Sequence, residues 1–468
     1  MCNSIVSRRE MLRRTGLGFG SLALAVLQHR EDLLASETTA RVHARTPHFA
    51  PQAKSIIMLV QGGGVSQMDV LDPKPELTKH NGKQYSKKLE VQQQGSESNT
   101  LLATHKKFFH RGRCGMEISE VLTHLGELAD DLCLVRSMFT EHNNHSEAQV
   151  MLMTGKIFEG RPAIGSWISY ALGRENQSLP TYVVLRDAGG ATANALWSSG
   201  WMPAVHRGTE FSSEGSPILN LRSAKQQPAG IQGNNLKFLS TLNRLHQTKY
   251  PHDQRLDSRI QNYELAARMQ LEALKIMGTE DETPQVQKLY GLDNPTTQSY
   301  GRRCLLARKL VERGVRCIQL FPPTGLTWDT HPNFDRAEKI SAATDLPAAG
   351  LIRDLKQRGL LESTIVLWCG EFGRLPISQN SRGRDHNRHA CSLLLAGGGF
   401  KPGHVHGATD EVGYEAVEDR MSVPDLHATI LHQLGIDHDQ LTYRHTGRDE
   451  TLTDSDVTGA QVVHSILT

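Results

Sequence analysis

Short apolar runs alternate along the chain with segments in which apolar residues recur every three or four positions. The short runs, bounded by turn residues, predict buried strands. The predicted strands cover residues 54–60, 131–138, 181–185, 316–321, 364–368 and 391–396. The helical spacing predicts helices over residues 146–154, 255–277, 299–313, 346–358 and 425–434.

The predicted strands are apolar throughout rather than at alternate positions, so both of their faces are expected to be covered. Strands that alternate with helices favour a parallel sheet, because each helix returns the chain to the edge where the previous strand began. The pattern therefore predicts an α/β fold. Its form is a three-layer sandwich with a mainly parallel central sheet and helices on both faces.

Residues 187–250 interrupt this alternation. They are rich in Gly, Ser, Asn and Pro and contain few periodic segments, which is typical of an insertion or of long surface loops. The predicted insertion extends over about residues 187–298. The rest of residues 46–468 is predicted to form one α/β domain.

Residues 1–45 have the features of an export signal and a linker. Residues 7–12 read SRREML, and an apolar run follows from residue 16 to residue 27. Adjacent arginines before a short apolar run are typical of twin-arginine signals, with a plain secretory signal as the alternative. The expected partner during export is the twin-arginine translocase, and the expected location is periplasmic or extracellular. Export in the folded state suits a protein that takes up its metal in the cytoplasm.

Charge and hydropathy exclude two classes of protein. The chain has 52 Lys and Arg against 50 Asp and Glu, and the first 30 residues hold five Arg and one Glu. Removing them leaves 47 against 49, so the body is not basic and nucleic-acid binding is not expected. Beyond the N-terminus no apolar run is long enough for a stable transmembrane segment. The 22 histidines raise the expectation of metal or acid–base chemistry.

Carboxylates and imidazoles follow four of the predicted strands. In parallel sheets ligands bind beyond the carboxyl ends of the strands, so these side chains are expected to meet in one place. Such groups are the ligands of hard or borderline divalent cations. The candidate ligands are Asp69, Asp329, His331, Glu371, Asp385 and His386.

Each candidate also has a purely structural interpretation. Asp329 lies in a TWDTH segment, where an aspartate often caps a turn, and Asp385 and His386 fit an exposed loop pair. Asn144 fits the N-cap of the helix predicted from residue 146. Glu371 follows a buried strand directly and is the hardest to explain structurally.

The chain resembles a known family at several long motifs. They read QGGGVSQMDVLDPKP, HNNHSEAQVMLMTG, TWDTHPNF, WCGEFGRLP, GRDHN and LLLAGGGFKPGHVHGATDEVGYEAVE, together with a long C-terminal segment. Over residues 50–468 the chain resembles the bacterial "domain of unknown function 1501" family, whose members are similar to the alkaline phosphatase/sulfatase superfamily. The resemblance implies an alkaline-phosphatase-like fold. It also implies metal-binding positions at Asp329, His331, Glu371 and His386.

Three departures from that superfamily affect the expected chemistry. Residues 61–64 read QGGG where the superfamily carries aspartate after the first strand, which leaves Asp69 as a substitute farther along the loop. The Asp329–His331 pair is more closely spaced than usual. The nucleophile position falls near His145, with Ser146 next to it, and the C-x-P-S-R motif is absent, so a strict sulfatase is not expected.

The leading hypothesis is metal-assisted hydrolysis of a phosphate or sulfate ester, with a small anionic ester or a sulfated or phosphorylated glycan as substrate. One or two divalent cations (Zn, Mn or Ca) would be held by the candidate ligands. Ser146 is the candidate nucleophile, and His142 and His145 are candidate acid–base groups or additional ligands. Candidate anion-binding residues are Asn144, Arg374 and Arg384.

Two alternatives belong to other classes. A non-catalytic exported binder of anionic glycans on a hydrolase-derived scaffold is favoured by the QGGG segment and by the absence of a clear nucleophile. A structural component of an exported assembly has no positive feature in the sequence.

Overall fold

The structure is a computed structural model. It describes residues 46–468, except 177, 188–193, 213–230, 251–253 and 279–280. The predicted export signal in residues 1–45 lies outside the described residues. Among the described helices, none combines the length and the apolar composition that a bilayer span requires.

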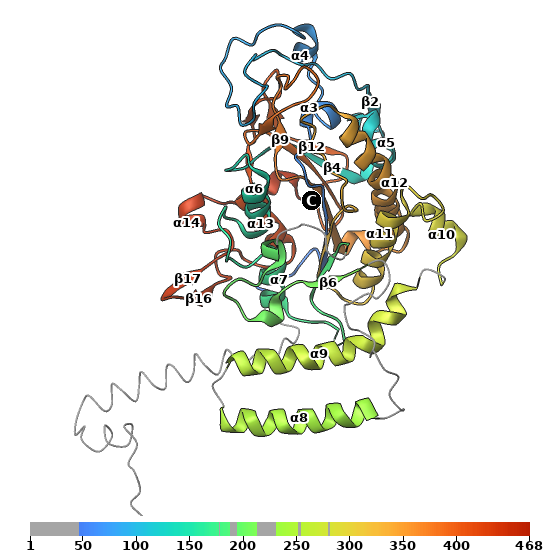
Figure 1. The fold of residues 1–468 in the computed structure, drawn as a ribbon, viewed down its shortest axis with the longest axis vertical. Helices are drawn as coiled ribbons and strands as arrows, with labels where there is room; N and C mark the ends of the chain where they lie inside the picture. Colours follow the sequence, from blue (N-terminus) through green and yellow to red (C-terminus); the bar gives the residue numbers. More distant parts are fainter. Residues whose placement is uncertain (1–45, 177, 188–193, 213–230, 251–253, 279–280) are drawn as a thin grey trace, which may run out of the picture.

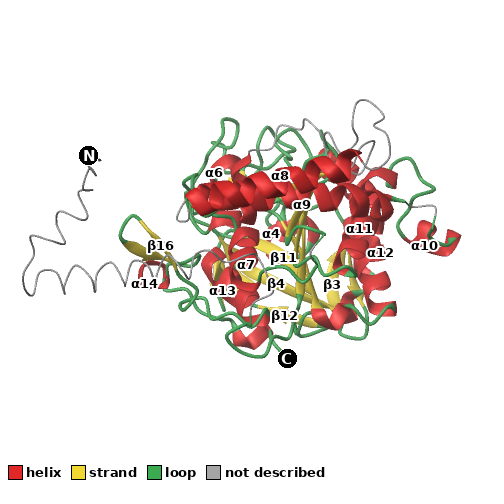
Figure 2. Ribbon diagram, turned by 90° about the horizontal axis from the view of Figure 1, so that it is seen from below, coloured by secondary structure: helices red, strands yellow, loops and turns green. Residues whose placement is uncertain are grey.

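A sheet of nine strands forms the centre of the molecule (Figures 1 and 2). Its order is β12-β4-β11-β8-β1-β7-β5-β6, and β15 also pairs with β4. All pairings are parallel except those of β11 with β4 and β8. The strands are β1 (Ser55–Val60), β4 (Leu132–Phe139), β5 (Tyr182–Leu185), β6 (Thr209–Phe211), β7 (Cys317–Leu320), β8 (Thr364–Cys369), β11 (Cys391–Ala396), β12 (His404–His406) and β15 (Met421–Ser422).

Helices cover both faces of this sheet (Figure 1). On one face are α6 (His145–Thr154), α7 (Ile164–Leu172) and α13 (Val423–Gln433); on the other are α5 (Thr123–Gly126), α9 (Gln254–Met277), α11 (Gln298–Val311) and α12 (Asp335–Gln357). The remaining α-helices are α3 (Gln67–Val70), α4 (Pro75–Lys79), α8 (Ile231–Lys249), α10 (Pro284–Leu289) and α14 (Ser455–Thr458). Short paired strands lie outside the main sheet: β2 (Phe108–Arg111), β3 (Met116–Ser119), β9 (Gly373–Arg374), β10 (His386–Asn387), β13 (Ala408–Thr409), β14 (Ala416–Glu418), β16 (Tyr443–His445) and β17 (Arg448–Glu450).

The central strand β1 shows why the fold has three layers. Its alternate side chains enter two separate apolar cores. Ile57 and Leu59 pack with α11 and α12, whereas Ile56 and Met58 pack with α6, α7 and α13. Every residue of β1 is buried. A strand that is apolar on both faces is therefore satisfied only between two helical layers. The predicted α/β sandwich is confirmed.

Two expectations from the sequence need correction. The predicted long loops of residues 187–250 include a helix of 19 residues, α8. The helix predicted over residues 346–358 begins earlier, at Asp335, where the Asn333 side chain accepts a hydrogen bond from the Asp335 amide at 3.1 Å. Buried Ala337 and Ile340 anchor these added turns.

His427 of α13 fastens this helix to α6. It is buried, and its Nε2 lies 2.8 Å from the Leu152 carbonyl oxygen, so Nε2 is the protonated nitrogen. Nδ1 is buried without a hydrogen-bond partner. Burial lowers the pKa of His427 to about 4, although the bond to Leu152 opposes this shift.

This geometry predicts a pH-dependent loss of stability. In the unfolded chain a histidine titrates near pH 6.5, so between about pH 6.5 and 4 the unfolded state binds the extra proton. The contribution of neutral His427 is complete above pH 6.5 and is lost as the pH falls toward 4, at a cost of about 3 kcal/mol. His427→Gln keeps the donor but cannot titrate. In urea unfolding at several pH values, the free energy of unfolding of the wild type should therefore fall by about 3 kcal/mol more than that of the variant between about pH 6.5 and 4.

The matched control is His110→Gln, at an exposed position in β2. It should follow the wild-type pH profile. Parallel profiles for the wild type and His427→Gln would contradict the assignment.

Candidate metal centre

Three chain segments that leave the sheet and one that enters it meet at one rim. His145 follows β4, Asp329 and His331 follow β7, and Glu371 follows β8. His386 precedes β11, and because β11 runs antiparallel to β8, its amino end lies at the same rim as the carboxyl ends of the parallel strands. The rim therefore collects side chains from residues 145 to 386, as expected for a mainly parallel sheet.

His145, Asp329, His331 and His386 form a compact cluster. Each offers one ligand atom, and all four atoms lie within 4.8 Å of one another. Asp329 Oδ1 lies 3.1 Å from Nε2 of His331, 3.6 Å from Nε2 of His145 and 3.8 Å from Nε2 of His386. The two Nε2 atoms of His331 and His386 are 2.8 Å apart.

The other nitrogen of each imidazole is bonded to an acceptor. His145 Nδ1 lies 2.6 Å from Glu371 Oε1, and His386 Nδ1 lies 2.6 Å from the Asn143 carbonyl oxygen. His331 Nδ1 lies 2.5 Å from Gln379 Oε1, and the amide nitrogen of Gln379 donates to the Gln94 carbonyl. Since these partners are acceptors, all three Nδ1 atoms carry the proton.

When all three imidazoles are neutral, three Nε2 lone pairs are directed at one another and at a carboxylate; against the effect of burial, the bonds of His145 to Asp329 and Glu371 raise the pKa of this imidazole to about 9 and so favour its protonated form. Such a set of lone pairs is repulsive unless a proton or a cation lies between its members. His145 Nε2 is also buried without a hydrogen-bond partner. Three imidazoles and one carboxylate match the ligand number and type of zinc sites, in which the second imidazole nitrogen donates to an outer acceptor. The residues present therefore fit a bound divalent cation.

Glu371 orients His145 instead of joining the cluster. It is fully buried, and besides His145 it accepts hydrogen bonds from the Gly63 amide at 2.9 Å and from Gln149 Nε2 at 3.3 Å. Burial alone would raise its pKa, but the bonds to His145 and Gly63 outweigh burial and lower it. A carboxylate at this place fixes the imidazole tautomer and increases its basicity.

Phe372 and Arg374 complete the support of the cluster. The buried Phe372 ring packs against His145 and His386, with ring centroids 4.8 and 4.6 Å away. Arg374 is also buried and donates to Asp329 Oδ1 at 2.7 Å. Burial opposes the charge of Asp329, yet His145, His386 and Arg374 hold the pKa of this carboxyl well below its usual range.

The glycines that follow β1 are required for steric reasons. Gly63 has φ +113, and a Cβ there would lie 2.6 Å from the Asp329 amide nitrogen. Gly64 has φ +71, and a Cβ there would lie 2.7 Å from Cδ2 of Phe372. The carbonyls of Gly63 and Gly64 both accept hydrogen bonds from Arg374. Gly63 and Gly64 are therefore packed against the segments that carry Asp329 and Phe372 and leave no room for a side chain at these two positions.

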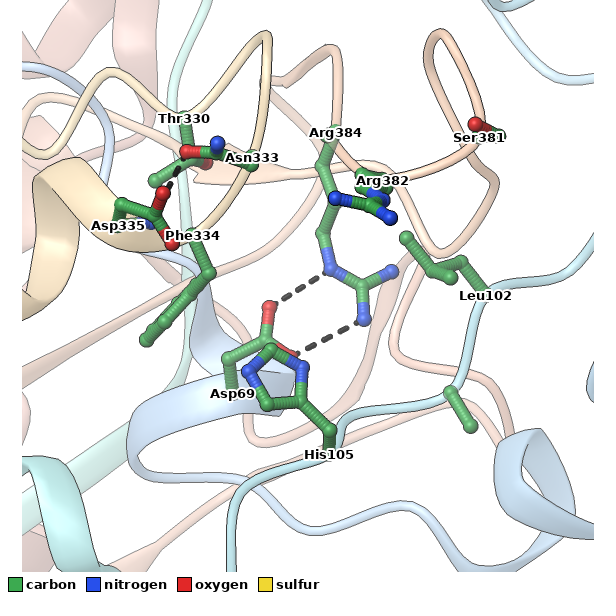
Figure 3. Close-up of a pocket in the computed structure, with 12 residues that line it drawn as sticks. Asp69, Leu102, His105, Thr330, Asn333, Phe334, Asp335, Ser381, Arg382 and Arg384 are labelled. Atoms are coloured by element: carbon green, nitrogen blue, oxygen red, sulfur yellow. Dashed lines mark hydrogen bonds and ion pairs between the residues drawn. The ribbon is translucent and has the colours of Figure 1, made fainter.

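Asp69 and Arg384 lie apart from the cluster and pair with each other. Arg384 Nε and Nη2 lie 2.7 and 3.1 Å from the two Asp69 oxygens, and both residues line a cavity of about 340 Å³ (Figure 3). Thr330, which lies between two of the cluster residues, also lines this cavity. The structure therefore does not bring the predicted ligand Asp69 to the cluster, and the Arg384 guanidinium is already paired with the Asp69 carboxylate.

Asp385 also takes no part in the cluster, although it precedes His386. One of its oxygens accepts hydrogen bonds from the Gln92 and Gln93 amides at 2.8 and 2.7 Å. The other accepts from the His386 amide at 2.8 Å. Asp385 thus holds the polar loop near residue 92 against the segment that carries His386.

Ser146 and Asn144 lie at the start of α6. Asn144 is the N-cap, with its side chain accepting from the Ser146 amide at 3.2 Å, and Gly155 ends the helix at φ +75. The capping interpretation of Asn144 is therefore confirmed. His142 Nδ1 accepts from the Asn144 amide at 3.1 Å, and the structure records no contact of the His142 side chain with the cluster among the described residues.

A cavity of about 500 Å³ opens in front of the cluster. His145, Ser146 and Asp329 reach it from one side. Arg186 and Asp187, which follow β5, line it as well, and no sequence motif had pointed to them. Their position after a strand of the same parallel set is the signal that would have found them.

The fold and the cluster define an α/β protein with a three-histidine, one-aspartate candidate metal centre at the rim of its sheet. Residues 53–467 match the family model described as "Protein of unknown function (DUF1501)". The chain belongs to this family, as its motifs predicted. No curated protein matches the chain.

Several solved structures are similar to the chain. One is a protein in the alkaline phosphatase superfamily from Vibrio parahaemolyticus, with 8% identity, coverage of 87% of this chain and 76% of that chain, and a TM-score of 0.36. The PsFucS1 sulfatase from Pseudoalteromonas sp. has 11% identity, coverage of 84% and 68%, and a TM-score of 0.35. The phosphonate monoester hydrolase SpPMH from Silicibacter pomeroyi has 13% identity, coverage of 88% and 78%, and a TM-score of 0.35. The chemistry of the site is therefore inferred from the side chains of this chain alone.

The position of Glu371 predicts an effect of Glu371→Gln on metal affinity. The substitution keeps an acceptor for His145 Nδ1 but removes the charge that makes the imidazole basic. We expect zinc affinity, measured by competition with a chromophoric chelator, to fall by about tenfold or more. The control Glu362→Gln, at an exposed position before β8, should leave affinity unchanged. Equal affinities for all three proteins would contradict an orienting role for Glu371.

Proposed function

We propose that the protein is an exported, metal-dependent hydrolase that acts on a phosphate or sulfate ester. In this proposal His145, Asp329, His331 and His386 hold one divalent cation. The observation that carries it is the convergence of three Nε2 atoms, each with its Nδ1 proton bonded elsewhere, on a single carboxylate oxygen.

The donor set also bears on the choice of cation. Three of the four donors are imidazole nitrogens, whereas calcium takes six to eight oxygen ligands. Zinc or manganese therefore fits the proposal better than calcium, and among these zinc agrees best with nitrogen donors. When bound, such a cation neutralises charge on ester oxygens and lowers the pKa of water.

The residues around the cavity have separate roles in the proposed reaction. The amino end of α6, whose His145 and Ser146 line the cavity, places its positive dipole end beside an anion there. Ser146, in the first turn, presents a hydroxyl beside the cluster and is the candidate nucleophile, with water as the alternative. Gln149 Nε2 lies one turn further along and adds a donor.

Arg186 takes the place in this proposal that Arg374 and Arg384 had in the sequence-based hypothesis. The guanidinium groups of those two residues are bonded to backbone carbonyls and to Asp329 or Asp69. Arg186 lines the cavity and stacks over the Trp197 ring at 5.1 Å, with Glu210 at 3.4 Å. The positively charged guanidinium of Arg186 at this wall of the cavity suits an anionic substrate.

The metal requirement can be tested on Asp329 and His331. We expect the purified protein to bind close to one equivalent of zinc or manganese and to hydrolyse an aryl phosphate or an aryl sulfate. Asp329→Asn and His331→Gln should each lower metal affinity by at least about 100-fold and abolish turnover, because each removes a direct ligand. The control Asp335→Asn, at an exposed position near the same loop, should preserve both. A protein that folds fully and binds no metal would contradict the proposal.

The same experiment separates the hydrolase from a glycan binder. The binder is favoured by two features: the glycine segment at residues 62–64, which supplies no carboxylate for a second cation, and the absence of a clear nucleophile. Its signature would be metal binding without turnover of either ester, together with binding of a sulfated glycan. In that case the Asp329→Ala and His386→Ala pair would remove the metal and leave glycan binding unchanged.

Ser146→Ala tests the nucleophile. If the Ser146 hydroxyl attacks the ester, kcat should fall by about a thousandfold or more while metal content stays the same. Ser341→Ala, remote from the cavity on α12, serves as the control for a lost hydroxyl. An unchanged kcat in Ser146→Ala would assign the attack to water and restrict Ser146 to lining the cavity.

A further inference from the structure

Helix α8 lies on the outside of the molecule, with α9 between it and the rest of the fold (Figures 1 and 2). In contrast to the other long helices, α8 contributes none of its described side chains to the two apolar cores, whereas α9 contributes Leu265, Met269 and Ile276. The hairpin of α8 and α9 is thus anchored by α9 alone. Helix α8 is free to present a surface of its own.

The polar and apolar faces of α8 are reversed relative to those of an ordinary surface helix. The partly buried side chains in its second half are Ser240, Asn243 and Gln247, which share one face by their spacing of three and four residues. Phe238 and Leu245 point the other way and are 65% and 66% exposed. The remaining exposed apolar residues of this helix are Ile231, Leu236, Leu239 and Leu242.

Exposure of such an apolar face to water is energetically unfavourable. A surface helix normally turns its apolar stripe to the core and its polar residues to solvent. Contiguous exposed apolar side chains on one element mark a site of interaction with a protein or a membrane. The face defined by Ile231, Phe238, Leu239, Leu242 and Leu245, here called the α8 face, therefore has a partner.

The charged residues of α8 indicate which kind of partner fits the α8 face. Residues 231–249 contain Lys237, Arg244 and Lys249 and no Asp or Glu. All three cations are exposed. A second copy of α8 on this face would bring cations next to cations with no carboxylate on either helix to compensate them. An anionic surface with an apolar interior satisfies both the charge and the apolar side chains.

We propose that α8 docks the protein onto an anionic lipid surface. The helix lies in the interface with Phe238, Leu242 and Leu245 among the acyl chains, and Lys237 and Arg244 reach the phosphate headgroups along the helix flank. Three charged and many other polar residues keep α8 on the surface instead of across the bilayer. The docking is independent of the candidate metal centre and concerns where the protein acts.

Vesicle co-sedimentation of the full chain tests this surface. The protein should bind vesicles of mixed phosphatidylglycerol and phosphatidylcholine, and binding should weaken with salt and be largely lost on pure phosphatidylcholine. Lys237→Gln with Arg244→Gln should weaken partitioning by about 25-fold, since each cation near an anionic surface contributes roughly fivefold. Phe238→Asp with Leu245→Asp should abolish binding.

The control is Val457→Asp on α14, which places the same new charge at an apolar residue that is 70% exposed. It should bind as the wild type does. All variants should keep the wild-type metal content, which shows that the fold is intact. Equal sedimentation of the wild type with both vesicle types, or none with either, would overturn the proposal. So would a dimer in analytical ultracentrifugation that Phe238→Asp with Leu245→Asp converts to monomers, because the α8 face would then bind a second copy.

Discussion

The carboxylate of Asp329 is the group on which the arrangement of the site depends. It faces three imidazole Nε2 atoms and at the same time accepts a hydrogen bond from the buried Arg374 guanidinium. Arg374 in turn holds the carbonyls of the glycine segment after β1. One negative charge thus connects the loops that follow several strands, and it is stable at this partly buried position because it is shared among cationic and hydrogen-bonding partners.

The supporting residues explain how three imidazoles can be held so close together. Glu371, Gln379 and the Asn143 carbonyl each accept a hydrogen bond from one Nδ1–H group and come from three different segments of the chain. The buried Phe372 ring restrains two of the imidazoles. A site prepared in this way is organised before any cation arrives, so little rotamer entropy remains to be lost on binding. Pre-organisation of this kind is characteristic of sites whose ligands act together.

The sequence predicted the layers of the fold and the rim that carries the site, because both follow from local patterns. Continuous apolar runs such as residues 364–368 specify a strand buried on both faces, and parallel strands direct their carboxyl ends to one edge. The sequence also indicated Asp329, His331 and His386 as candidate ligands, and His145 as a candidate acid–base group or additional ligand. It could not separate a ligand from a supporting carboxylate: Glu371 stands behind His145, while Asp69 pairs with Arg384. Those distinctions depend on contacts between residues hundreds of positions apart.

Helix α8 shows a different limit of sequence patterns. Its apolar residues have helical spacing, yet the segment reads as a polar loop because Gly, Asn, Ser and Thr are interspersed among them. The orientation of the helix, with its polar face against α9, cannot be read from periodicity, because the same pattern serves a helix turned either way. Only the packing of the hairpin reveals that its apolar face is left outside.

X-ray absorption spectroscopy at the zinc edge of the zinc-loaded protein tests the central claim most directly. The account predicts three imidazole nitrogens and one carboxylate oxygen at about 2.0–2.2 Å, with one imidazole contribution lost in His386→Gln. A spectrum with a single imidazole, with sulfur ligands, or unchanged by His386→Gln would contradict the claim that these four side chains converge to hold a cation.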